Sequence, residues 1–155
     1  MSTRKIRIRR ERRGTTVVET AVVLPVFLLM VFVILEFGHA FMVTQVLQAA
    51  ARRGARLGVT TGATSEDVVQ KVKDILSGTI STDDVTVIVK NADVFDTSGS
   101  APGDIALLPD VEVADMEPRQ LFLVRVEVPY DNVRVINLEF LAGIVLKGQA
   151  VMRHE

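Results

Sequence analysis

The stretch RRGTTVVE (residues 12–19), followed directly by TAVVLPVFLLMVFVIL (residues 20–35), decides how this chain folds. It places a glycine at position 14 and one carboxylate, Glu19, five residues later, at the start of a long uncharged run. A charge in a membrane-spanning helix costs about 2.5–3.5 kcal/mol at the bilayer centre and less toward the ends. Because Glu19 lies inside such a segment, the pattern predicts that its carboxylate has a functional partner.

The net charge of −1 conceals two oppositely charged regions. Residues 1–14 hold seven basic residues and one acidic residue, a net charge of +6, whereas residues 15–155 hold 11 basic and 18 acidic residues, a net charge of −7. A basic segment before an apolar one stays in the cytoplasm by the positive-inside rule, which predicts an extracytoplasmic C-terminal domain. A DNA-binding arm would also be basic, but its position beside an apolar segment favours a membrane lipid partner and no nucleic acid.

The apolar run extends from position 17 to position 43 and is interrupted only by Glu19, Glu36 and His39. As a helix it would be about 40 Å long, which exceeds the roughly 30 Å hydrocarbon core of a bilayer. It is also longer than the apolar region of a cleaved secretory signal, about 7–15 residues, although the alanines at 49–51 imitate a cleavage site. Pro25 cannot donate its backbone N–H, which predicts a mild kink in the membrane helix.

The remaining segments predict a small α+β domain. The helix should continue over residues 44–58, and a second helix should start after Thr64, with Asp67 in the capping-box position. Residues 85–90, 111–113, 121–128 and 146–153 are predicted strands, and residues 133–145 a loop. The expected organisation is therefore a basic leader (1–14), a transmembrane helix (15–43), a helix extension (44–58) and an extracytoplasmic domain (59–155) with a three- to four-stranded antiparallel sheet.

Two sets of polar residues on the long helix each allow two interpretations, one functional and one in which the side chains only meet water. Arg52, Arg53 and Arg56 lie opposite its apolar face, either as solvated side chains or in contact with lipid head groups or a neighbouring subunit. Glu36 and His39 share one face at i,i+3 spacing, either in a polar contact with a partner helix or as interfacial side chains that reach water.

The sequence shows no recognised catalytic motif. The chain contains no cysteine, which excludes disulfides, thiolate zinc sites and cysteine nucleophiles. Its two histidines have no accompanying ligand cluster, and no phosphate-binding loop or nucleophile-elbow sequence is present. Neither an enzymatic activity nor a metal or other cofactor is expected.

The combined pattern resembles the TadE-like family of pseudopilins from tight-adherence (Flp-type) pilus systems. The residues that carry the resemblance are Gly14 and Glu19, together with the strings LP (24–25), EFG (36–38) and AARRGAR (50–56). The final string AVMRHE (150–155) also resembles the family's C-terminal segment. One departure is Thr15, because many pilins begin with Phe or Met, which puts N-methylation at this position in doubt.

The resemblance implies a precursor that an aspartic prepilin peptidase cleaves between Gly14 and Thr15. Cleavage creates an ammonium group at Thr15, which Glu19 can bind within one helix or between subunits. The implied partners are the peptidase, other pilins or pseudopilins in a hetero-oligomer, and the assembly platform of the inner membrane. The implied function is that of a minor pseudopilin in pilus assembly, adhesion or related secretion.

Two alternatives stay open at this point. A permanent single-pass membrane protein with an extracytoplasmic ligand- or partner-binding domain would keep its leader. A type II secretion pseudopilin would share the glycine and glutamate of the cleavage signal, but it usually lacks the EFG and AARRGAR elements.

Overall fold

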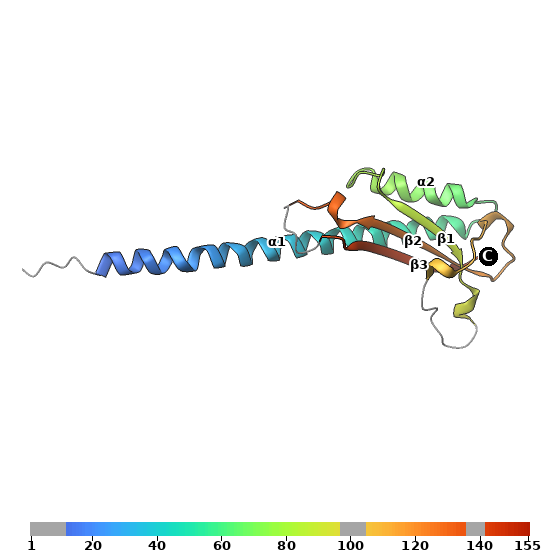
Figure 1. The fold of residues 1–155 in the computed structure, drawn as a ribbon. Coiled ribbons are helices and arrows are strands. Elements are labelled where there is room, and N and C mark those ends of the chain that lie inside the picture. Colours follow the sequence, from blue (N-terminus) through green and yellow to red (C-terminus); the bar gives the residue numbers. More distant parts are fainter. Residues whose placement is uncertain (1–11, 97–104, 136–141) are drawn as a thin grey trace, which may run out of the picture. The chain divides into compact units, whose positions relative to one another are not determined.

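The computed structural model describes residues 12–96, 105–135 and 142–155. Its helices are α1 (Arg12–Gly58) and α2 (Ser65–Leu76), and its strands are β1 (Thr86–Asn91), β2 (Leu121–Pro129) and β3 (Val145–Arg153) (Figure 1). The chain forms two compact units, Met1–Phe37 and Gly38–Glu155, and α1 contributes residues to both. The predicted α+β class with a long apolar N-terminal helix is confirmed.

The described part of the first unit consists of helix α1 up to Phe37. Pro25 lies inside this helix, as predicted, and the helix continues through it. Most apolar side chains from Val17 to Phe37 are exposed, including Val26 at 69% and Leu29 at 61%. This part of α1 is therefore apolar, and within the described part of its own unit no core covers it.

The second unit contains a three-stranded antiparallel sheet in the order β1-β2-β3. The register pairs Val89 of β1 with Val124 of β2, and Val124 with Ala150 of β3. These three residues lie opposite one another, so their side chains face the same side of the sheet, and all three are buried. Phe122, with no exposed surface, lies on the same face, where its ring would contact a side chain added at Gly58 of α1.

The fourth strand predicted for residues 111–113 is wrong. A short 3-10 helix, Val113–Asp115, occupies this region, and an isolated bridge between Lys90 and Asp110, just before it, pairs with β1. The side chain of Glu112 accepts hydrogen bonds from the backbone N–H groups of Ala114 and Ser65. Such local side-chain bonds to the backbone compete with strand pairing.

The part of α1 from Gly38 onward packs closely on the rest of the second unit. Its buried face carries small residues, with Ala50, Ala51 and Ala55 fully covered. A Cβ atom added at Gly54 would lie 2.5 Å from Val72 Cγ2 of α2. One added at Gly148 of β3 would lie 2.4 Å from the carbonyl carbon of Leu47. Small residues at these positions are what allow the helix to approach both α2 and the sheet.

Helix α2 begins where the capping-box prediction placed it. The Thr64 hydroxyl accepts a hydrogen bond from Asp67 N at 3.1 Å, and the Asp67 carboxylate accepts from Thr64 N at 3.0 Å. The buried face of α2 consists of Val68, Val72 and Leu76, each one helical turn after the last, and the helix ends at Leu76.

Candidate processing and assembly site

The bond between Gly14 and Thr15 lies in the first turn of α1, which begins at Arg12. A protease requires an extended backbone at the bond it cuts, so this turn must open before cleavage. The first four N–H groups of a helix have no intrahelical acceptor, and glycine costs about 1 kcal/mol relative to alanine in a helix. Opening this turn is therefore inexpensive compared with opening the middle of the helix. Residues 1–11 of the predicted leader lie outside the described residues.

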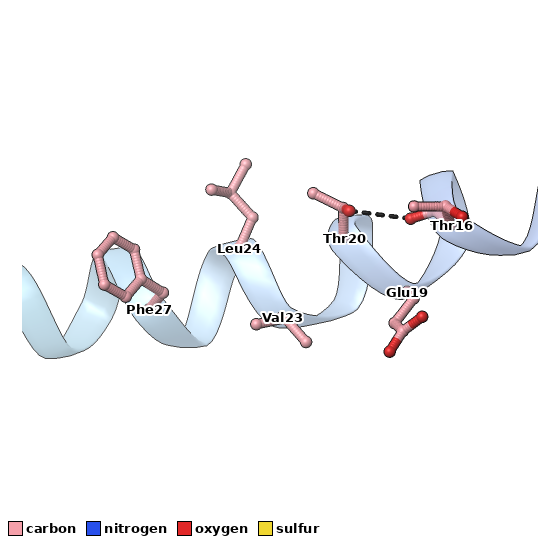
Figure 2. A pocket seen from close by; sticks show the side chains of 6 residues that line it. All are labelled: Thr16, Glu19, Thr20, Val23, Leu24 and Phe27. Atoms are coloured by element: carbon pink, nitrogen blue, oxygen red, sulfur yellow. Dashed lines mark hydrogen bonds between the residues drawn. The ribbon is translucent and has the colours of Figure 1, made fainter. Parts of the chain in front are cut away.

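Glu19 lies one helical turn after Thr15 and is exposed. It lines a shallow groove on the helix surface together with Thr16, Thr20, Val23, Leu24 and Phe27 (Figure 2). The Thr20 hydroxyl donates a hydrogen bond to the Thr16 carbonyl at 2.9 Å, which satisfies this polar group inside the helix. Among the described residues, the Glu19 carboxylate forms neither a hydrogen bond nor an ion pair.

The geometry allows Glu19 to reach a new amine at Thr15. Helical side chains point toward the N-terminus, so a side chain at position i+4 lies over the turn that contains residue i. In the uncleaved chain the nitrogen of Thr15 is an amide without charge. Only cleavage after Gly14 turns it into an ammonium group that can form an ion pair with Glu19.

The helix around Glu19 exposes apolar side chains on all sides. A helix that is apolar all round lies in a membrane or within a protein assembly, because a solvated helix keeps one polar face. The large hydrophobic side chains of this stretch with more than half of their surface exposed are Val17, Val18, Val22, Val23, Val26, Phe27, Leu29, Met30, Ile34, Leu35 and Phe37.

The structure places Glu36 and His39 in different environments. Glu36 is only 2% exposed, so it is not an interfacial side chain that reaches water. His39 lies within the second unit, where its Nε2 atom is 2.8 Å from the carbonyl oxygen of Val133. A carbonyl can only accept, so Nε2 carries the hydrogen in this contact. The predicted contact of these two residues with a partner helix stays a prediction.

The three arginines at the end of α1 are all exposed, as the sequence pattern predicted. Arg53 and Arg56 line a surface groove between α1 and α2 together with Lys71. Sequence reasoning missed Lys71, because nothing in the local pattern indicates which face of α2 lies next to α1.

Sequence reasoning also missed a polar contact between α1 and β3. The Gln48 side chain donates a hydrogen bond to the Gln149 carbonyl and accepts one from Gln149 N at 3.1 Å. Gln48 thereby satisfies backbone groups on the outer edge of β3. The two residues are 101 positions apart, so no local sequence signal could have paired them.

Within the described ranges, no three histidine, aspartate or glutamate side chains come together as a possible metal site. The two acidic residues after β1 instead bind other parts of the domain: Asp96 forms an ion pair with Arg153 at 3.0 Å, and Asp93 binds the backbone. Asp93 Oδ1, for example, accepts a hydrogen bond from Leu121 N at 2.7 Å.

These features define a class of protein: a small α+β domain attached to an N-terminal helix, within Thr16–Gly58, that is long and apolar enough to cross a membrane once. Residues 14–56 match the family model described as TadE-like protein, which confirms the resemblance over Gly14, Glu19 and most of α1. A TadE-like segment indicates involvement with tight-adherence pilus systems, and this pilus-associated family is not known for enzymatic activity. No curated protein and no solved structure matches the chain. The resemblance of residues 150–155 lies outside the match and stays a prediction.

Proposed function

We propose that this chain is a minor pseudopilin of a tight-adherence pilus, cleaved after Gly14 by a prepilin peptidase. It takes part in pilus assembly, and through it in adhesion or related secretion. Its partners are other pilins or pseudopilins, in a hetero-oligomer, and the assembly platform of the inner membrane.

The observation that carries this proposal is the position of Glu19 on a fully apolar, exposed helix, five residues after Gly14. In a permanent membrane anchor, a carboxylate in the apolar segment only opposes insertion. In a subunit that leaves the bilayer to pack against other helices, the carboxylate can form an ion pair with a neighbouring group. The carboxylate is then paired by an ammonium group that exists only on cleaved subunits.

The pairing makes assembly selective for processed chains. Two opposite charges that are brought together in an apolar contact compensate each other, whereas one buried charge without its partner costs about 3–5 kcal/mol. An uncleaved chain has no amine at Thr15 and leaves Glu19 unpaired. Cleavage therefore acts as the signal that a subunit is ready to pack.

We place the second unit, including the α+β domain, outside the cytoplasm. The leader charge of +6 holds the N-terminus inside, and the described residues contain one helix that could span the membrane. Protease added to spheroplasts should digest the domain, and lysis should add no further cleavage. Full protection of the domain while the inner membrane is intact would reverse this orientation.

The test of the proposal is substitution of Glu19 in the full chain. Glu19→Val removes a charge that the bilayer disfavours, so the variant should be inserted and cleaved at least as well as wild type. It should nevertheless fail in pilus-dependent surface attachment, because the Thr15 ammonium group would lack its partner. Glu19→Asp keeps the charge and should retain part of the attachment.

Normal attachment by Glu19→Val would contradict the proposal and favour a permanent membrane protein. If attachment is normal in both variants but secretion of a soluble protein is lost, the chain is a pseudopilin of a type II secretion system instead. Measuring both properties in the same strains separates the three possibilities.

A further inference from the structure

The second unit carries a basic groove, defined here as the surface lined by Arg53, Arg56, Leu57, Thr60, Lys71 and Ile75. Arg53, Arg56 and Lys71 are exposed, while Leu57 and Ile75 are partly buried between the helices. The groove therefore combines an apolar floor with three cations. Among the described residues, none of these cations forms an ion pair.

No carboxylate of the described residues forms an ion pair with the cations of the groove, although two are spaced to pair with Lys71. Asp67 and Asp74 lie four residues before and three residues after Lys71 on α2, where helical ion pairs form. Asp67 instead binds the backbone and hydroxyl of Thr64, and Asp74 accepts a hydrogen bond from Gln70 at 2.8 Å. The cations of the groove can therefore still form ion pairs with another molecule.

The position of the groove along α1 disfavours lipid head groups as that molecule. The apolar run ends near Val43, and Arg53 is ten residues further along the helix, a rise of about 15 Å. The head-group region extends only about 5–8 Å beyond each side of the hydrocarbon core. A groove at this position is better placed to meet protein.

The same unit exposes an acidic segment, residues 110–117, which contains four carboxylates and no basic residue. Two of these carboxylates are engaged, because Asp110 binds Lys90 at 2.7 Å and Glu112 binds Ser65 N at 2.7 Å. Asp115 and Glu117 are exposed and form no ion pair among the described residues. The small apolar residue Ala114 is exposed beside them.

We propose that the basic groove of one copy binds the acidic segment of a second copy of this chain, with Asp115 and Glu117 facing Arg53 and Arg56. The two surfaces share no residue, so each copy can use both at once. Such a contact between different surfaces builds a ring or an open row of subunits rather than a closed pair. Electrostatic complementarity of this kind sets partner choice and register more than overall affinity.

The test is site-specific cross-linking of full-length chains in membranes, and the absence of native cysteine removes background. One tagged copy carries Thr60→Cys at the groove, and a differently tagged copy carries Ala114→Cys in the acidic segment. A short bismaleimide should link the two copies. The proposal does not depend on leader removal, so the same yield is expected when Gly14 is replaced and processing fails.

Charge reversal then identifies the contact. Arg53→Glu with Arg56→Glu in the groove copy should lower the cross-linked yield roughly ten-fold or more. Asp115→Lys with Glu117→Lys in the other copy should restore it. The matched control is Asp83→Lys with Asp84→Lys, an exposed acidic pair elsewhere in the domain, which should not restore it.

Three results would overturn the proposal. The first is no cross-link between chains that are inserted and folded like wild type. The second is a cross-link that is indifferent to reversal of the arginines. The third is a loss of cross-linked yield that reversal of Asp115 and Glu117 does not restore. That result would mean that the groove binds a different acidic subunit or lipid.

Discussion

Helix α1 has two parts that differ in what surrounds the same kinds of side chain. Before Gly38 most of its leucines and valines are exposed, with Leu29 at 61%, whereas after Gly38 Val43 and Leu47 have no exposed surface. The first part keeps large apolar residues, and the second uses alanine and glycine to approach α2 and the sheet. The comparison teaches that only the second part is stabilised by the chain itself, while the first needs a membrane or a neighbouring subunit.

A matched pair of substitutions tests this difference, and it has the largest expected effect. Leu47→Ala should destabilise the domain by about 2–5 kcal/mol, because it leaves a cavity in the core. Leu29→Ala should leave the unfolding of the domain unchanged, because that exposed side chain belongs to the first unit and is not part of the hydrophobic core of the domain. Thermal unfolding of both full-length variants in detergent, followed by circular dichroism, gives the comparison. Equal losses of stability would show that the two parts of α1 are not distinct.

A smaller effect is expected at the start of α2. Thr64→Ala removes the N-cap hydroxyl and should cost about 1 kcal/mol, whereas Thr64→Ser keeps an acceptor for Asp67 N and should cost much less. Chemical denaturation of the two variants measures the difference. If serine and alanine have the same cost, the hydroxyl is not what stabilises this helix end.

The smallest expected effect is a dependence on acid pH. Hydrogen bonds from Thr64 lower the pKa of Asp67, and a hydrogen bond from Ser65 lowers the pKa of Glu112. A carboxyl group whose pKa is lowered by folding stabilises the folded state above its unfolded pKa, and this contribution disappears as the pH falls through the folded pKa. The domain should therefore lose stability as the pH falls below the usual carboxyl range.

The double variant Asp67→Asn and Glu112→Gln should be less stable at neutral pH and should show a shallower loss in acid. Denaturation midpoints measured across that pH range are the readout. An acid profile identical to that of wild type would show that neither carboxylate contributes to it.

Much of this architecture could be predicted from the sequence, because the deciding signals are local. The capping residues Thr64 and Asp67, and the alternation along β2 and β3, each act within a few residues. The strand expected at residues 111–113 failed because Glu112 bonds to Ser65, 47 positions away. The groove residue Lys71 and the pair of Gln48 with Gln149 were missed for the same reason, since tertiary packing alone brings them into place.

Among the candidate site residues, too, some features could be predicted from the sequence and others could not. Gly14, Thr15 and Glu19 could be selected because their spacing is a linear signal. The burial of Glu36, which is only 2% exposed, could not be predicted. It depends on contacts in the folded chain that no short sequence pattern encodes.

The most direct test of the central claim is the intact mass of the chain isolated from membranes of cells with an active prepilin peptidase. The account predicts a mature chain that begins at Thr15, without the first 14 residues. It also predicts that Gly14→Val, which introduces a β-branched side chain at the bond to be cut, leaves the precursor uncut, while Gly14→Ala is cut in part. A dominant species that begins at Met1 or Ser2 in such cells would contradict the account.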